Sequence, residues 1–170
     1  RTMPIVAHND LPTFQRLRDE GVRVLNPDRA LHQDIRELHI GLLNMMPDKA
    51  LAATERQFFR LIGESNPIAQ FYVHPFTLPE IERSDAATTH ISQYYETFDE
   101  LREQGLDALI ITGANVTHPN LSQEAFWQPL SAVIDWASTM QGEGLSLDLP
   151  QAPPPVKQMT VQELAEFLKN

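Results

Sequence analysis

A lysine and a glycine-containing turn are the groups in this sequence whose positions best suit chemistry. Lys49 follows the apolar run 38–43, and the turn follows the apolar run 109–111. A lysine cation can hold a carboxylate or a phosphate, and the backbone N–H groups of a turn can stabilise an acyl oxyanion. The plainer interpretations are a solvated surface lysine and a glycine required only for a tight turn. The turn consists of Gly113, Ala114 and Asn115.

Other reactive side chains give weaker signals. The sequence contains no cysteine, which excludes disulfides, thiolate zinc sites and thiol nucleophiles from these residues. The serines lack a G-x-S-x-G context, so a serine hydrolase is not indicated. Four of the six histidines are scattered without metal-ligand spacing, and we predict no metal site; these four are His39, His74, His90 and His118. We interpret His74 as structural and His118 as a solvated or capping residue.

Composition places the chain among globular proteins of ordinary hydrophobicity. The 170 residues are 42% hydrophobic and carry a formal net charge of −10, and this length suits one domain. The negative charge argues against a nucleic-acid partner, which favours a basic surface. No apolar run approaches the roughly 18 residues that span a bilayer, and no apolar segment follows the N-terminus as in a signal peptide. We therefore expect a cytoplasmic protein without a membrane partner.

Alternating strand and helix patterns explain how the two candidate groups could meet. The predicted strands are 38–43, 68–74 and 109–111, and the predicted helices are 50–62, 91–104 and 126–137. Before them, residues 4–30 form an irregular arm in which Thr13 caps a short helix and 22–25 form an edge strand. Strand–helix alternation predicts a parallel α/β sheet with right-handed crossovers. The carboxyl ends of its strands lie at one edge, where open sheets of this type bind ligands.

The pattern changes after Ala137, and no further strand follows it. Glycines and prolines predict a linker over residues 138–158. Residues 159–170 predict a short amphipathic helix. The expected organisation is thus a domain over residues 1–137, a proline-rich linker and a terminal helix.

Three stretches carry a family likeness in their order and spacing. They are residues 43–49 (LNMMPDK) with 53–61 (ATERQFFRL), residues 105–114 (GLDALIITGA), and residues 126–136, from FWQPL to DW. Together they resemble the homoserine O-succinyltransferase family of methionine biosynthesis, and the likeness covers about residues 3–137. It implies a partial doubly wound parallel sheet with flanking helices, flavodoxin-like or class I glutamine amidotransferase-like, incomplete at its C-terminal side.

The resemblance also implies a reaction. Family members transfer a succinyl group, or in some an acetyl group, from coenzyme A to the hydroxyl of homoserine. Succinyl-CoA or acetyl-CoA is then a co-substrate, and no resident cofactor is expected. The family uses a cysteine nucleophile, a histidine base and a glutamate that orients the histidine. None of these three catalytic positions is found in this chain, so we expect an acyltransferase fragment that is inactive alone.

The same resemblance implies roles for individual residues. Lys49 matches a family lysine thought to line the site. Asn115 stands where the family often has proline, so the match of the turn is imperfect. Thr117 falls at the position that helps to select the acyl donor, and an uncharged residue there favours succinyl over acetyl.

Two other interpretations remain open. The absence of cysteine suits a non-catalytic binding or regulatory module. Residues 158–164 resemble the first helix of rhodanese-like domains, which suits the front part of a fusion protein. In either case a sheet that lacks its next strand exposes an unpaired edge, so we expect low stability, aggregation or a homodimer formed through that edge.

Overall fold

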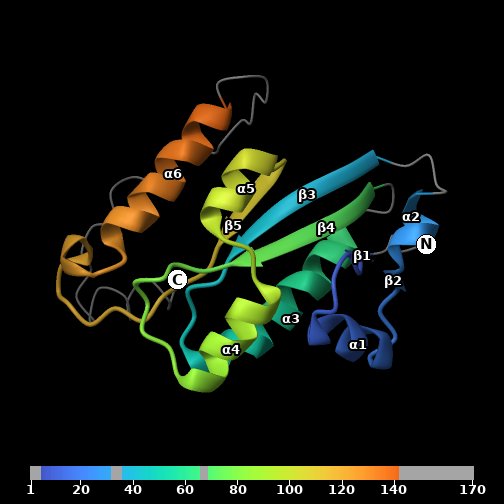
Figure 1. The fold of residues 1–170 in the computed structure, drawn as a ribbon, viewed down its shortest axis with the longest axis horizontal. Helices are drawn as coiled ribbons and strands as arrows, with labels where there is room; N and C mark the ends of the chain where they lie inside the picture. The colour runs from blue at the N-terminus through green and yellow to red at the C-terminus, as the bar shows by residue number, and fades with distance from the viewer. Residues whose placement is uncertain (1–4, 32–35, 66–68, 142–170) are drawn as a thin grey trace, which may run out of the picture. The chain divides into compact units, whose positions relative to one another are not determined.

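A five-stranded, all-parallel sheet forms the centre of the protein in this computed structural model, which describes residues 5–31, 36–65 and 69–141 (Figure 1). The strand order is β2-β1-β4-β3-β5. The strands are β1 (Ile5–Val6), β2 (Val24–Leu25), β3 (Arg36–Leu43), β4 (Ala69–Phe76) and β5 (Ala108–Ile111). The helices are α1 (Pro12–Asp19), α2 (Pro27–Leu31), α3 (Asp48–Ser65), α4 (Asp85–Tyr94), α5 (Phe98–Gln104) and α6 (Trp127–Gln141), with a 3-10 turn, η1 (Leu121–Gln123). The predicted α/β class with a parallel sheet is confirmed.

The chain divides into two units, Arg1–Ala137 and Ser138–Asn170. Nearly all of the second unit lies outside the described residues, including the rest of the predicted linker and the predicted terminal helix. Helix α6 continues to Gln141, so the first four residues of the predicted linker are helical.

The N-terminal arm contributes two strands to the sheet rather than one. Strand β1 was not predicted, because two residues carry no periodicity and only pairing identifies them. Ile5 pairs with Val24 of β2 and with Phe71 of β4. The edge strand predicted at 22–25 is present as β2, but it is limited to Val24–Leu25. Thr13 does not cap α1, because its hydroxyl donates to the Glu55 carboxylate instead.

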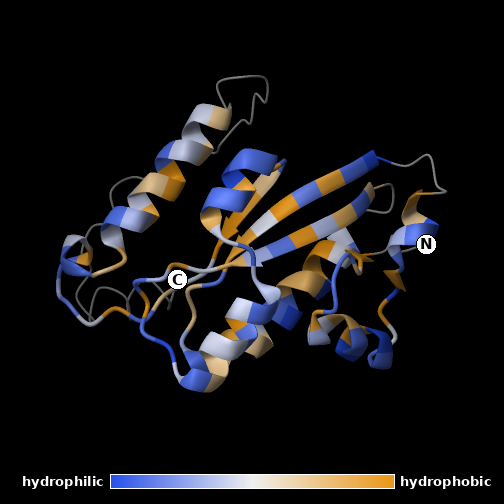
Figure 2. Ribbon diagram, in the orientation of Figure 1, coloured by the Kyte–Doolittle hydropathy of each residue, from blue (hydrophilic) through white to orange (hydrophobic). Residues whose placement is uncertain are grey.

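Two apolar clusters cover the sheet, and alternation along the strands separates them. Leu42 belongs to the cluster that α1 and α3 complete, through Phe14, Leu17 and Phe59. The next residue, Leu43, belongs to the cluster that contains Leu101 of α5 and Leu130 of α6. Figure 2 shows hydrophobic bands along β3 and β4, with hydrophilic bands between some of them.

The single helix predicted over 91–104 is wrong, because two helices occupy residues 85–104. Tyr95 adopts an extended conformation, with φ −92° and ψ 144°. Thr97 then starts α5 with a capping box, in which its side chain accepts from the Glu100 amide and the Glu100 carboxylate accepts from the Thr97 amide. Helix α4 begins before the predicted start at residue 91, and Ser84 caps it by accepting from the Ala87 amide.

The strand predicted over 68–74 and the helix predicted over 50–62 both extend past their predicted ends. Strand β4 continues through Pro75 to Phe76, which is possible because β1 pairs with β4 only near Phe71 and needs no N–H from Pro75. Helix α3 continues past Gly63, which is buried where an added Cβ would lie 3.1 Å from Ile5. Gly105 does end α5, with φ 79°.

Strand β5 is the outer strand on one side of the sheet. Within the described ranges it pairs only with β3, from Ile40↔Ala108 to Leu43↔Ile111. Ile111 is 39% exposed although its sheet neighbour Leu43 is fully buried. An exposed apolar strand edge is a site for pairing with another strand.

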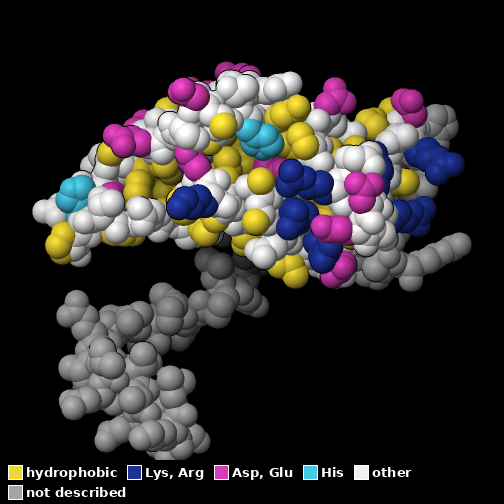
Figure 3. All heavy atoms as spheres, turned by 90° about the horizontal axis from the view of Figure 1, so that it is seen from below, with side chains coloured by type: hydrophobic (Ala, Val, Ile, Leu, Met, Phe, Trp, Pro, Cys, Tyr) yellow, Lys and Arg dark blue, Asp and Glu magenta, His cyan; other side chains and the backbone are white. Residues whose placement is uncertain are grey.

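The described surface is mixed in charge. On the face that Figure 3 shows, lysine and arginine side chains lie among acidic ones. None of the helices in the described part of the chain is long and apolar enough to cross a membrane.

Candidate functional site

Loops from the carboxyl ends of β3 and β5 meet around a cavity of about 600 Å³. Four of the predicted site residues line it together, as parallel pairing of β3 with β5 requires. They are Lys49, Ala114, Asn115 and Thr117. Gly113 is next to this group in the chain but does not line the cavity.

A buried polar network fixes the loop after β3. The Asn44 side chain is fully buried and donates to the Leu51 carbonyl at 3.0 Å and to the Tyr95 hydroxyl at 3.2 Å. The Tyr95 hydroxyl in turn donates to Glu55 Oε2 at 2.7 Å. Burial, followed by the nearby charge of Glu55, raises the pKa of Tyr95 well above its ordinary value. Tyr95 therefore stays protonated and keeps donating to Glu55.

Arg83 holds the same loop from the other side. Its side chain is only 6% exposed. It donates to the carbonyls of Asn44 and Met46 and to Asp48 Oδ1, which lies 3.2 Å away. Asp48 also accepts from the Ser84 amide at 2.7 Å. The Ser84 amide and the Arg83 guanidinium lower the pKa of Asp48, so its carboxylate remains charged and the start of α3 is held in place.

Lys49 is the exposed cation at this edge of the sheet. It is the second residue of the 18-residue helix α3, where a positive side chain opposes the helix dipole. None of the ion pairs between described residues includes Lys49. A cation in this unfavourable place is available for a bound anion.

The turn after β5 is joined directly to the loop after β3. Thr112 accepts a hydrogen bond from the Met45 amide at 2.8 Å, and its own amide donates to the Leu43 carbonyl at 3.0 Å. Gly113 does not have a positive φ, and the nearest atom to an added Cβ would be Met46 Sδ at 3.9 Å. Neither backbone strain nor packing against the described residues requires glycine there, so the tight-turn interpretation lacks support.

Glu124 organises the wall of the cavity that contains Thr117. Its buried carboxylate accepts from the Thr117 amide at 2.6 Å and from the His118 amide at 2.7 Å. The Thr117 hydroxyl is 3.3 Å from both carboxylate oxygens. These hydrogen bonds, above all that from the His118 amide, lower the pKa of Glu124. His118 itself lines the cavity, beside Thr117.

Acidic groups dominate the cavity wall. Asp48, Glu80, Glu82 and Glu124 line it together with the single cation Lys49. Arg83 and the two amides already engage Asp48 and Glu124. A ligand carboxylate would therefore find Lys49 as its cationic contact among the described lining residues.

Several residues that build the site were not predicted. Glu55 lies within the stretch 53–61 that carried the family likeness, but its role depends on contacts with Thr13, His90 and Tyr95 from other elements. Arg83 and Glu124 stand in polar segments without periodicity. No sequence pattern marks them, because their partners are backbone groups that only the fold brings near.

The family model of homoserine O-succinyltransferase matches residues 4–147. The chain belongs to this family. The match extends past Ala137, where the predicted likeness ended. It includes every residue that lines the cavity.

Curated members of the family align with most of this chain but with a minor part of their own length. The homoserine O-succinyltransferase of Allochromatium vinosum is 75% identical over 135 residues, which are 79% of this chain and 38% of that protein. The corresponding proteins of Thiobacillus denitrificans and Methylococcus capsulatus are 69% and 68% identical over 135 residues, with 79% of this chain and 39% and 38% of theirs covered. The chain thus spans about two fifths of the length of these relatives.

Proposed function

We propose that this chain is the N-terminal part of an acyltransferase that moves a succinyl group from succinyl-CoA to the hydroxyl of homoserine. The observation that carries the proposal is that Lys49, Ala114, Asn115 and Thr117 line one cavity within the segment matched by the family. The names of the relatives supply the reaction.

Lys49 is proposed to bind an anionic part of a substrate. The succinyl carboxylate, the homoserine carboxylate and the phosphates of coenzyme A all suit an ammonium group. The acidic lining makes a second anion unfavourable, because like charges at short range repel in a site of reduced dielectric. One carboxylate at Lys49 is therefore the arrangement we favour.

The turn after β5 is proposed to present backbone N–H groups to the acyl oxygen. The exposed Gly113 leaves space beside the main chain, and donors aimed at a developing oxyanion lower the barrier of acyl transfer. Thr117 is proposed to favour succinyl, because it is uncharged. Glu124, 3.3 Å from its hydroxyl, is already occupied by two backbone amides.

The acyl-accepting nucleophile is proposed to come from outside this chain. The 170 residues contain no cysteine, and we propose that the histidine and glutamate implied by the family resemblance also come from outside this chain. Strand β5 pairs only with β3 in the described sheet. It offers an edge on which the next strand of the relatives, carrying the nucleophile, would pair.

Complementation tests this proposal. The chain alone, supplied with homoserine and succinyl-CoA, should release no coenzyme A above background. Mixed with a polypeptide that carries the C-terminal remainder of the Allochromatium vinosum relative, it should form O-succinylhomoserine, and Lys49→Ala should reduce kcat/KM at least about tenfold, or 1.4 kcal/mol. Arg102→Ala is the matched control, because Arg102 is an exposed cation that does not line the cavity. Robust turnover by the chain alone would overturn the proposal.

A non-catalytic binding module is the second candidate. The absence of cysteine together with a formed cavity favours it. Calorimetry separates the two, since an acyltransferase part should bind homoserine or succinyl-CoA at the Lys49 cavity. A module for another ligand should bind neither. The fusion with a rhodanese-like domain concerns residues 158–164, which lie outside the described residues.

A further inference from the structure

Two histidines and a glutamate from three separate segments meet beside β4. One potential ligand atom from each of His8, His74 and Glu96 lies within 4.8 Å of the other two. His8 follows β1, His74 lies within β4, and Glu96 lies between α4 and α5. Metal-ligand spacing in the sequence could not show this group, because its members are 66 and 22 residues apart.

The backbone fixes all three positions. Ile5 of β1 is in register with Phe71 of β4, so three residues further along each parallel strand the chain reaches His8 and His74. Glu96 forms a bridge with Phe76, and its amide donates to the Pro75 carbonyl at 3.1 Å. The juxtaposition therefore follows from main-chain pairing and not from the rotamers of long side chains.

One ring nitrogen of this group, the buried His8 Nε2, has no hydrogen-bond partner in the described structure. The other nitrogen of the same ring, Nδ1, lies 3.3 Å from the Val6 carbonyl. Buried polar atoms are nearly always paired, so an orphaned one requires an explanation. When Nδ1 carries the proton that it donates to the Val6 carbonyl, Nε2 can offer its lone pair to an ion.

His74 has both a carboxylate and a second imidazole as neighbours. Its Nδ1 is 2.6 Å from Glu96 Oε2, and its Nε2 is 2.9 Å from His39 Nδ1. The His39 ring is itself stacked on Tyr72 at 4.8 Å. A histidine ligand usually has its second ring nitrogen hydrogen-bonded to an outer group, which fixes its tautomer and orientation. His39 is placed to do this when His74 Nδ1 is the ligand.

We propose that His8, His74 and Glu96 form a binding site for a divalent transition-metal ion such as Zn²⁺. Two imidazoles and one carboxylate are a common zinc ligand set that leaves one position open, and imidazole ligands favour zinc, copper, nickel and iron over magnesium or calcium. Tetrahedral zinc holds its ligand atoms about 3.4 Å apart. Side-chain rotation would therefore bring the more distant ligand atoms, which lie up to 4.8 Å apart, closer together. It would also separate His74 Nδ1 from Glu96 Oε2, which are 2.6 Å apart, so that the ion replaces the contact between them.

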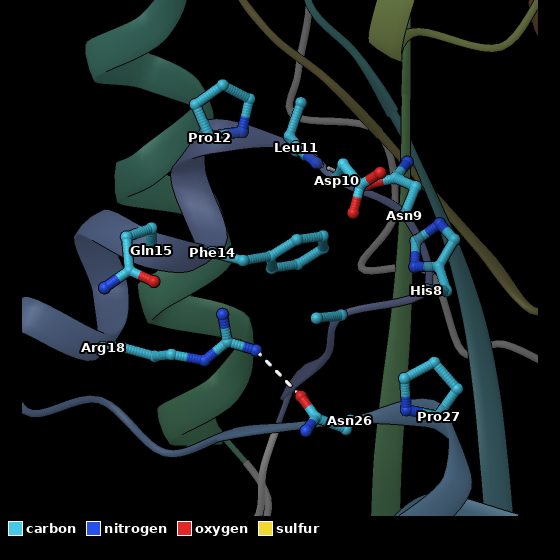
Figure 4. A pocket seen from close by; sticks show the side chains of 11 residues that line it. His8, Asn9, Asp10, Leu11, Pro12, Phe14, Gln15, Arg18, Asn26 and Pro27 are labelled. Carbon is cyan, nitrogen blue, oxygen red and sulfur yellow. Dashed lines mark hydrogen bonds between the residues drawn. The ribbon is translucent and has the colours of Figure 1, made fainter.

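One member of the group, His8, borders a cavity. His8 lines a cavity of about 590 Å³ together with Asn9, Asp10 and Phe14, and Figure 4 shows these side chains around it. This cavity shares no lining residue with the one that contains Lys49. The proposed ion site is thus separate from the proposed acyl-transfer site and does not depend on that function.

Titration with Zn²⁺ alone tests the proposal, with Co²⁺ as a spectroscopic probe. We expect one Zn²⁺ per chain by calorimetry, a rise in Tm with added Zn²⁺, and visible Co²⁺ absorption of a four- or five-coordinate site. His8→Gln and Glu96→Gln should each weaken binding at least about tenfold. His118→Gln is the matched control. His118 also lies 3.2 Å from a glutamate, Glu124, but it belongs to no group of three potential ligands in the described part of the chain.

The outcomes are decisive in both directions. Loss of Zn²⁺ affinity in the two ligand variants, with His118→Gln unchanged, supports the site. Absence of Zn²⁺ binding by the unmodified chain overturns it, and so does binding that both ligand variants retain. If Glu96→Gln does not fold, His8→Gln decides alone, because His8 is only partly buried and its Nε2 contributes no hydrogen bond to the described fold.

Discussion

The buried carboxylate of Glu55 accepts a hydrogen bond from the Tyr95 hydroxyl at 2.7 Å. The same hydroxyl accepts from Asn44 at 3.2 Å, so one phenol connects helix α3 with the loop that precedes it. Glu55 is fully buried, so removal of the Tyr95 hydroxyl would leave a buried carboxylate with one hydrogen bond fewer. The geometry of the Lys49 loop therefore depends on a contact remote from Lys49.

Tyr95→Phe should lower the free energy of unfolding by about 1–3 kcal/mol, because a buried acceptor and a buried donor lose their partner. Urea denaturation measures this change. Tyr94→Phe is the matched control, since no hydrogen bond of the Tyr94 hydroxyl is recorded in the described structure, and it should cost less than about 0.5 kcal/mol. Equal effects of the two variants would contradict the assignment.

Arg83→Lys should destabilise the protein by roughly 1–3 kcal/mol although the charge is kept. A lysine cannot reproduce the several directions in which the guanidinium donates, and buried carbonyls of the loop lose donors. Arg102→Lys, at an exposed pair with Asp99, should change stability by less than about 0.5 kcal/mol. Thermal melting of both variants provides the comparison. Similar Tm values for both would show that Arg83 does not hold the loop.

Glu124 should titrate below its ordinary pKa of 4.5. Because the folded pKa is lower than the unfolded one, the stabilisation by Glu124 is present above the unfolded pKa and disappears as pH falls through the folded pKa. The amide chemical shifts of Thr117 and His118 should follow this titration in NMR spectra, with a midpoint below 4.5. Glu124→Gln should abolish the transition. A midpoint at or above the ordinary value would be inconsistent with the two amide hydrogen bonds.

Substitution by alanine should change the free energy of unfolding differently at two glycines, Gly113 in the turn after β5 and Gly41 in β3. Gly113→Ala should be neutral or stabilising by less than about 1 kcal/mol, because its φ and its surroundings accept a Cβ. Gly41→Ala should destabilise by about 1–3 kcal/mol, because the new Cβ would lie 2.5 Å from Leu106 Cδ1.

Urea denaturation measures both glycine variants. In the complemented assay, Gly113→Ala should reduce turnover without loss of stability if the turn approaches the acyl group. Destabilisation by Gly113→Ala would instead revive the tight-turn interpretation.

The edge of β5 should cause self-association. Ile111 is 39% exposed there, so we expect a concentration-dependent dimer in size-exclusion chromatography with light scattering. Ile111→Lys should shift the equilibrium to monomer, because a charge on an edge strand opposes pairing. Leu61→Lys is the control, as Leu61 is 60% exposed on α3. A monomer at every concentration, with a sharp transition well above about 65 °C, would refute the expectation.

The boundaries that failed in the sequence prediction share a cause. The break between α4 and α5 and the passage of β4 through Pro75 depend on neighbours, namely the bridge from Glu96 to Phe76 and the short reach of β1. The long periodic elements β3 and α3 were predicted nearly in full, because each carries its own apolar pattern over several residues. Short elements such as β1 have no pattern of their own.

The sequence alone determined the alternation of strands and helices, and hence the parallel sheet and the edge at which Lys49, Ala114, Asn115 and Thr117 would meet. It did so because period and turn residues are local properties. Only the tertiary structure decided that Arg83 and Glu124 hold the cavity walls, and that His8, His74 and Glu96 lie together. Those contacts join residues from different segments, and their distances are set by strand register and packing, which no local pattern records.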